Sequence, residues 1–489
     1  MRAKHSQSGF ALLLFMIVMI GFITAGFSGL LTSSVKQKNE QARIKTQQAL
    51  MKAKEALLGY AVDYRIQNDF DQMGKLPCPD VSSATNLEGS QDASCGAISE
   101  NSVGLFPFKS VGLGKVEDAN GECLWYVVSG DYKNSPTAKM LNWDSVGYLN
   151  VVDENGNLKH GASEDDYPIA LIISPGKALD GQDHSPDAAL PQCHANFTVT
   201  NYLEGGVNID YSTDHPATAD TLWQFLDTSE SAYLDNSDHN DQVIAVYRSE
   251  LWDRVAAMKD LEANNSAGVA PSSPIENLTK SLAECIAVYG NAEAQRRLPY
   301  PAPLDLTEYR VNTNYDDVPT NYGRFPQVVD SSIVNHNKFV LDTTGTSYCE
   351  GVATAYDELF WKNWKDHFFY WVSEDFNSVT GAPIGNKCTG TGLSAGCIKI
   401  DGNSDKVAAV VLFSNKALNS QSRIWWWNSV TSSEDIDDKS DQNNYLEGDA
   451  VNVYGGGTLN YNLSVINSDY AYCVKYAGST LSAIKCADL

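Results

Sequence analysis

Two short acidic segments carry the residue types that a calcium ion prefers. The candidate ligands form two groups along the chain: Asp235, Asp238 and Asp241, then Asp435, Asp437, Asp438 and Glu447. Carboxylate oxygens at short spacing are what Ca²⁺ takes as ligands. Neither segment matches the EF-hand loop, because Lys439 stands where the second would need an oxygen ligand. We therefore treat both as candidate Ca²⁺ sites, with solvated acidic loops as the alternative, and expect no other cofactor.

One motif resembles the nucleophile turn of a hydrolase. Gly392-Leu-Ser-Ala-Gly396 has the G-x-S-x-G form, which needs a strand before it and a helix after it. Here the motif lies between Cys388 and Cys397 in a turn rich in Gly, Thr and Ser, and an apolar strand-like run follows. The histidines show no H-E-x-x-H pattern. We predict a disulfide-closed loop, no catalytic residues and no enzyme activity.

Three consecutive tryptophans, Trp425, Trp426 and Trp427, form a candidate binding surface. Successive side chains of a strand point to opposite faces, so we expect at least one indole to be exposed. An exposed Trp is suited to binding carbohydrate or a partner protein. Packing between parts of the core is the alternative.

The ten cysteines indicate disulfides in an oxidising compartment. Their number is even, none forms a C-x-x-C pair, and all follow residue 77. Proximity favours Cys78–Cys95, Cys388–Cys397 and Cys473–Cys486, and it leaves the remaining pairing open. The chain has a net charge of −26, but residues 1–60 alone carry +6, so the remainder is strongly acidic. An acidic surface repels phosphate backbones, which argues against nucleic-acid binding.

The N-terminal residues predict how the rest is positioned. Residues 10–31 contain no charge and are long enough to span a bilayer as a helix. A charged stretch up to residue 64 follows without proline, with apolar residues at helical spacing. We expect one long helix over residues 10–64, with a membrane span at residues 10–31. A secretory signal peptide cut near Ser28 and a plain membrane anchor are the alternatives.

This beginning resembles that of type IV pilins and type II secretion pseudopilins. The resemblance implies that residues 1–9 are a leader and that a prepilin peptidase cuts between Gly9 and Phe10 and methylates the new N-terminus. It also implies that the helix binds other pilin subunits. Leu14 stands where these families usually have Glu. Its apolar side chain and the chain's 489 residues favour a tip subunit over a repeated shaft subunit.

The remainder of the chain repeats its own motifs in the same order. Glu55-Ala-Leu-Leu-Gly-Tyr60 is echoed by Glu284-Cys-Ile-Ala-Val-Tyr289, and Asn201-Tyr-Leu-Glu-Gly205 by Asn444-Tyr-Leu-Glu-Gly448. Apolar runs such as residues 169–173 and 407–413 predict buried strands. We expect an α+β chain with two tandem pilin-like heads, at residues 65–248 and 249–489. Each head would be a helix packed on a mostly antiparallel sheet.

Together these observations predict a non-enzymatic subunit at the tip of a type IV pilus or type II secretion pseudopilus, acting in assembly initiation or adhesion. It would reside in the inner membrane of a Gram-negative bacterium, with the head in the periplasm or outside the cell. The alternative is a membrane-anchored periplasmic binding or enzymatic domain that the peptidase does not process. Residue patterns do not separate a pilus from a secretion system.

Overall fold

The computed structural model describes residues 37–64, 73–81, 87–96, 100–135, 141–163, 166–186, 190, 192–204, 222–229, 239–256, 274–306, 309, 315–329, 339–340, 361, 363–378, 381–388, 397–400, 406–417, 421, 423, 426–428, 433–435, 437–446, 460–461 and 470–489.

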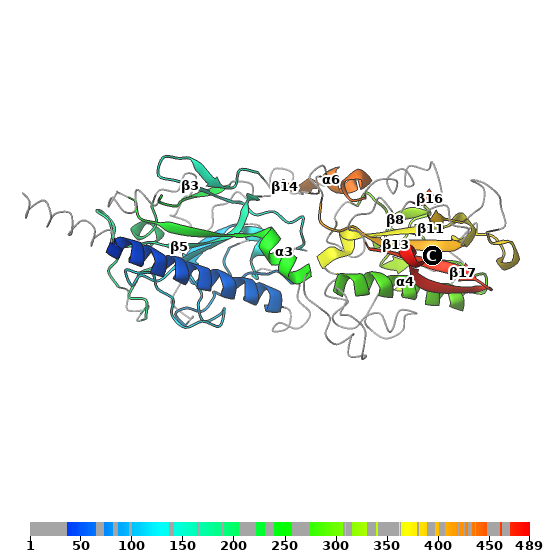
Figure 1. Ribbon diagram of the computed structural model, residues 1–489, viewed down its shortest axis with the longest axis horizontal. Helices are drawn as coiled ribbons and strands as arrows, with labels where there is room; N and C mark the ends of the chain where they lie inside the picture. The colour runs from blue at the N-terminus through cyan, green and yellow to red at the C-terminus, as the bar shows by residue number, and fades with distance from the viewer. Residues whose placement is uncertain are drawn as a thin grey trace, which may run out of the picture.

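A long amphipathic helix over residues 37–64 begins the described part of the chain. Its apolar side chains recur every three or four residues, which gives the helix one apolar face. Leu50, Ala53, Leu57 and Ala61 on that face are buried. On the flank, Lys54 Nζ donates a hydrogen bond to the carbonyl oxygen of Ala245 at 2.7 Å, in a strand of the first sheet. The helix therefore runs along one face of this sheet (Figure 1).

The first sheet has four antiparallel strands in the order β1 (Ser102–Leu105), β2 (Trp125–Val128), β5 (Pro168–Ser174) and β7 (Gln242–Tyr247). Every residue of β5 is buried, as expected for a continuous apolar run in a central strand. A three-stranded sheet contacts β5 through β3 (Leu149–Val152), which lies between β4 (Leu158–His160) and β6 (Trp223–Leu226).

The second sheet has five antiparallel strands in the order β8 (Tyr322–Arg324), β11 (Phe368–Val372), β13 (Val407–Phe413), β17 (Tyr470–Ala477) and β18 (Thr480–Lys485). Helix α4 (Pro274–Ala292) packs against β13, β17 and β18. Short pairs complete the described strands: β9 (Val328–Val329) with β10 (Phe339–Val340), β12 (Lys399–Ile400) with β16 (Asn460–Tyr461), and β14 (Trp426–Asn428) with β15 (Ser433–Asp435).

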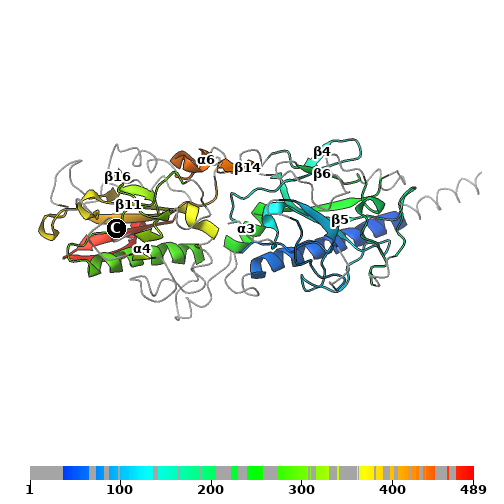
Figure 2. The same cartoon turned by 180° about the vertical axis from the view of Figure 1, so that it is seen from behind.

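The two sheets share a matching glycine–tyrosine pair between their first strand and its neighbour. Gly104 pairs with Tyr126 in the first sheet, and Gly323 pairs with Tyr370 in the second. At each glycine, an added Cβ would lie 2.7 Å or less from a backbone carbonyl oxygen, so the neighbouring segment can approach closely. A strand irregularity near the start of β5 recurs near the start of β13. The two helix-and-sheet units lie side by side along the long axis (Figures 1 and 2).

Helix α3 (Arg248–Ala256) lies where the two units meet, and the predicted domain boundary at residue 249 falls at its start. The indole of Trp252 packs edge-on against Trp364 of the second unit, with ring centroids 5.2 Å apart. The indole N–H of Trp252 donates to the hydroxyl of Tyr132 in the first unit at 3.4 Å. Arg254 pairs with Glu55 of the first helix at 2.7 Å. Aromatic packing therefore joins the units at this point.

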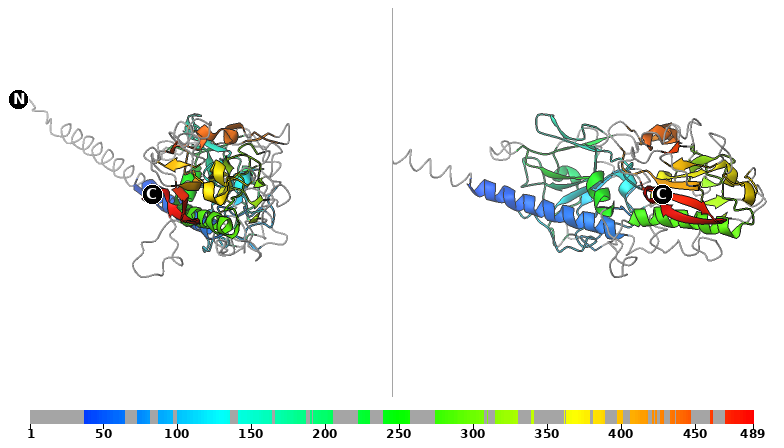
Figure 3. Two further views of the ribbon diagram at one scale, coloured as in Figure 1. Left: turned by 90° about the vertical axis from the view of Figure 1, so that its right-hand side faces the viewer. Right: turned by 45° about the vertical axis from the view of Figure 1, so that its right-hand side comes forward.

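The predicted fold class needs a correction. The chain is α+β, but among the residues that the structure describes no helix is both long and apolar enough to cross a bilayer. Of the helix predicted over residues 10–64, the structure describes residues 37–64, where charged residues such as Lys38, Arg43 and Lys52 alternate with the buried apolar face. This helix is a packing element of the first unit (Figure 3). The predicted span at residues 10–31 lies outside the described residues.

Candidate functional site

The structure joins most of the described cysteines in pairs. Cys78 bonds to Cys95, Cys388 to Cys397 and Cys473 to Cys486, which are the pairs that proximity favours. Cys123 bonds to Cys193, 70 positions away, which sequence spacing did not suggest. Cys285 is also disulfide-bonded. No cysteine of the described chain is free, so none is available there as a nucleophile or a thiolate ligand.

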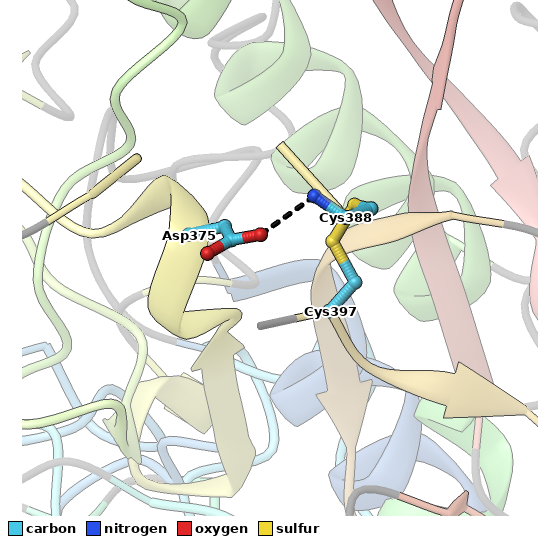
Figure 4. A group of neighbouring side chains, drawn as sticks. All are labelled: Asp375, Cys388 and Cys397. Atoms are coloured by element: carbon cyan, nitrogen blue, oxygen red, sulfur yellow. Dashed lines mark hydrogen bonds between the residues drawn. A yellow bond between two sulfur atoms is a disulfide. The ribbon is translucent and has the colours of Figure 1, made fainter. Parts of the chain in front are cut away.

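The motif that resembles a hydrolase turn falls at residues 392–396, outside the described residues. Its flanks are described. A short 3₁₀ helix (Ile384–Asn386) precedes the Cys388–Cys397 disulfide, and β12 follows it. Asp375 Oδ2 accepts a hydrogen bond from the backbone N–H of Cys388 at 2.6 Å (Figure 4). Asp375 and the two sulfurs lie close enough for a metal site, but the disulfide removes both thiolates that a metal would need.

Several predicted site residues cannot be placed. Gly9, Phe10, Leu14, Asp235, Asp238, Trp425 and Glu447 lie outside the described residues. Trp426 and Trp427 are in β14, which pairs with Asp435 and Glu434 of β15. Asp437 and Asp438 begin the short helix α6 (Asp437–Ser440). The structure therefore describes the side chain of one candidate calcium ligand, Asp241.

Asp241 lies directly before β7 and faces a second carboxylate, Glu204, which follows the 3₁₀ helix Val199–Asn201. Asp241 Oδ2 accepts a hydrogen bond from the N–H of Glu204 at 2.9 Å. Glu204 Oε2 in turn accepts from the N–H groups of Asn240 and Asp241, at 2.7 and 3.0 Å. Each carboxylate is thus fixed by the backbone of the other, and each keeps one further oxygen.

Those further oxygens, Glu204 Oε1 and Asp241 Oδ1, are buried and accept no hydrogen bond of good geometry, although the Gln182 side chain lies close enough to lower the pKa of Glu204. Glu204 is 9 % exposed and Asp241 2 %. Burial raises the pKa of Glu204, and burial together with the Glu204 charge raises the pKa of Asp241 well above its usual range. Two desolvated carboxylates in contact need either a proton or a cation between them. Since their free atoms are oxygens, a hard cation such as Ca²⁺ fits them best.

Sequence spacing did not select Glu204, although it belongs to the repeated Asn201–Gly205 motif. The signal was present, because an acidic residue recurs at the same place in both copies, Glu204 and Glu447. We call Glu204 and Asp241 the carboxylate pair.

A second buried cluster lies between the two units and combines residues far apart in sequence. We call it the inter-unit cluster: Asp144, Asp366, His367, Lys439 and Tyr445. Asp144, Asp366 and His367 are of types that bind metals and lie close together. Lys439 Nζ, however, lies 3.0 Å from Asp144 and 2.5 Å from Asp366. The ammonium supplies the positive charge that a metal would otherwise bring, so the cluster is a buried ion network.

Comparisons with known proteins add no relative: no family model, no curated protein and no solved structure matches this chain.

Proposed function

We propose that this protein is a non-enzymatic subunit of an exported filament of the type IV pilin or type II secretion pseudopilin kind. It would be placed at the filament tip and act in assembly initiation or adhesion. The observation that carries the proposal is the pair of equivalent helix-and-sheet units, with Gly104–Tyr126 and Gly323–Tyr370 in matching register. A helix packed along an antiparallel sheet is the head architecture that the N-terminal resemblance implies.

Three further features support this function over an enzyme. The disulfides suit a protein exported across the inner membrane to an oxidising compartment. The buried carboxylates of the inter-unit cluster are paired with Lys439, which supports a structural role for this cluster. A strongly acidic chain is suited to contact with basic surfaces of other proteins.

The N-terminus of the mature protein tests this proposal. Mass spectrometry of protein from cells should find a methylated Phe10 as the first residue. A Gly9→Ala variant should accumulate as precursor, whereas a Ser8→Ala control should be processed normally. An intact Met1, or a cut near Ser28, would remove the protein from the pilin pathway and favour the membrane-anchored binding or enzymatic domain.

The carboxylate pair favours an additional function, cation binding in the first unit. A ligand that binds only the folded state raises its stability, so Ca²⁺ should raise the melting temperature and a chelator should lower it. The Glu204→Gln, Asp241→Asn double variant should no longer respond to either treatment. Asp63→Asn, which removes an exposed carboxylate, serves as the matched control. An equal Ca²⁺ response in the double variant would show that the ion binds elsewhere, and no response in the wild type would mean that the pair shares a proton.

A further inference from the structure

A buried ammonium and two buried carboxylates meet at the contact between the two units. Lys439 Nζ lies 2.5 Å from Asp366 Oδ2 and 3.0 Å from Asp144 Oδ2. Lys439 is 1 % exposed and Asp366 is fully buried. The rings of Tyr445 and Tyr309 lie 5.6 and 5.9 Å from the same Nζ. An amine and a carboxyl group are therefore held against each other in an aromatic surrounding that excludes bulk solvent.

The other oxygen of Asp366 is held by a hydrogen-bond donor. Asn142 Nδ2 donates to Asp366 Oδ1 at 2.9 Å. The same amide also donates to the carbonyl oxygen of Asn363 at 3.0 Å, which fixes its orientation. A donor on Oδ1 draws electron density from the Asp366 Cγ and would stabilise negative charge that develops on this oxygen. Asp366 thus contacts the Lys439 amine through Oδ2 and the Asn142 amide through Oδ1.

Asp144 is placed to accept a proton from the same amine. Its Oδ2 lies 3.2 Å from His367 Nε2 and 3.4 Å from the Tyr445 hydroxyl, besides its contact with Lys439. Burial alone would raise the pKa of Asp144, but the charges of Lys439 and His367 hold it well below its usual range. Asp144 therefore stays ionised, and it can take up a proton only transiently, as a relay between the amine and a departing hydroxyl.

His367 lies next to Asp144. Its Nδ1 lies 2.7 Å from the carbonyl oxygen of Ser414, which can only accept, so Nδ1 carries the proton of this hydrogen bond. Its Nε2 lies 3.2 Å from Asp144 Oδ2 without forming a hydrogen bond. An amide between Lys439 and Asp366 would remove one charge of each sign from the cluster.

We propose that Lys439 and Asp366 become joined by an intramolecular amide bond, with Asp144 as general base and Asn142 as oxyanion donor. The Lys439–Asp366 ion pair seen in this structure would be the state before the reaction. The reaction needs the Lys439 nitrogen to move from the carboxylate oxygen toward Cγ. Groups held in such a near-attack geometry reach an effective concentration of roughly 10⁵ M or more, whereas free amines and carboxylates in water do not condense.

The atoms and charges balance without any other reactant. One proton of the Lys439 ammonium moves to Asp366 Oδ2, which gives a neutral amine and a carboxylic acid. The nitrogen lone pair attacks Cγ, and a second proton passes from nitrogen to Asp144 Oδ2. Asp144 returns that proton to the departing hydroxyl, the C–O bond breaks, and one water molecule leaves. Burial alone would lower the pKa of Lys439, but the carboxylates of Asp144 and Asp366 raise it, so the ion pair is the resting form.

The bond would close a loop within the second unit, yet its general base and oxyanion donor come from the first unit. Asp144 and Asn142 lie in the segment before β3, whereas Asp366 and Lys439 lie beside β11 and in α6. The reaction would therefore begin only after the two units have docked. Once formed, the bond would fix the segment around α6 in its docked position.

Tryptic mapping of the reduced and alkylated full-length protein tests the proposal, because trypsin cuts after Lys439 only if its amine is free. We expect no cut there, and we expect residues 366–387 and 424–475 to be recovered as one linked species lighter by one water molecule than the two peptides together. Lys439→Arg is the matched control, since it keeps the charge and the acidic neighbours of the cleavage site but cannot form the amide. The proposal is overturned if trypsin cuts the wild-type protein after Lys439 as completely as it cuts the variant after the new arginine, and if the 366–387 peptide is recovered free. The cluster would then be a structural ion network.

An Asp144→Asn variant separates chemistry from packing. Asn keeps the shape and one acceptor oxygen but accepts no proton under these conditions, so the linked species should fall at least tenfold. The unchanged disulfide pattern of the same sample verifies that the variant is folded. A linked species at wild-type yield in this variant would exclude Asp144 as the base.

Discussion

Asp80 offers the most direct test of how burial controls charge in this fold. It ends the Leu76–Asp80 segment beside the Cys78–Cys95 disulfide, and its Oδ2 accepts a hydrogen bond from the N–H of Gly89 at 2.6 Å. Burial, together with the charges of Asp92 and Glu88, raises the pKa of Asp80 to about 7, against the opposing effects of the Gly89 hydrogen bond and Lys109. Asp80 therefore binds a proton in the folded state that it releases when the chain unfolds at neutral pH.

The sign and the size of the effect follow from linkage. Because the folded pKa lies above the unfolded one, the contribution of Asp80 to stability is fully present below about pH 4 and is lost as the pH rises through about 7. A shift of about three pKa units would correspond to about 4 kcal/mol. Only the part of this effect that falls between about pH 5 and about pH 8 is measured, so we expect roughly 2 kcal/mol.

The test is an Asp80→Asn substitution, which removes the titration but keeps an acceptor for Gly89. Urea unfolding followed by tryptophan fluorescence, with the disulfides intact, should give a variant that gains about 2 kcal/mol relative to wild type between about pH 5 and about pH 8. Asp63→Asn controls for the removal of one negative charge from the surface. If the Asp80→Asn and wild-type stabilities change in parallel with pH, burial does not hold the proton on Asp80 and the reasoning is refuted.

Two other substitutions test packing and covalent closure. At Gly147 an added Cβ would lie 1.9 Å from the Pro168 carbonyl oxygen at the start of β5, so Gly147→Ala should lower the free energy of urea unfolding by about 3 kcal/mol. The control is Gly114→Ala, where no atom lies within 4 Å of the added Cβ, and it should lower that free energy by under about 1 kcal/mol. Equal costs would mean that the backbone near β5 shifts freely. Replacing Cys123 and Cys193 by Ser opens a loop of 70 residues and should lower the free energy of unfolding by about 4 kcal/mol. The same replacement at Cys388 and Cys397 opens a loop of nine residues and should lower it by about 2.5 kcal/mol. The reverse order would show that loop entropy does not set the cost.

Local signals in the sequence predicted the strands well. The apolar runs at residues 169–173 and 407–413 lie within β5 and β13, because a strand covered on both faces must be apolar at every position. The nearby cysteines pair because short loops close at little entropic cost, and this rule carries no information about Cys123 and Cys193. Sequence patterns therefore predict contacts between residues that are near one another in the chain.

The contacts of the buried charged residues could not be predicted from local sequence patterns. Asp241 was selected for its acidic neighbours in sequence, but its partner in the fold is Glu204, 37 positions earlier. Lys439 was taken as the residue that spoils a calcium loop, whereas the structure buries it between Asp144 and Asp366, which are distant in sequence. No periodicity brings these residues together, since their contact depends on how the two units dock. The N-terminal processing residues remain a prediction from resemblance.

The docking of two similar units explains why charge is buried at their contact. Two copies of one architecture present similar apolar surfaces, and apolar contact alone would tolerate several relative placements because the hydrophobic effect has no direction. Trp143, Trp252 and Trp364 supply that contact. A buried ion network adds little net stability, but a misplaced unit would leave Lys439 or its two carboxylates uncompensated at a cost of about 3 kcal/mol or more. The inter-unit cluster therefore selects one arrangement, and an amide between Lys439 and Asp366 would make that selection permanent.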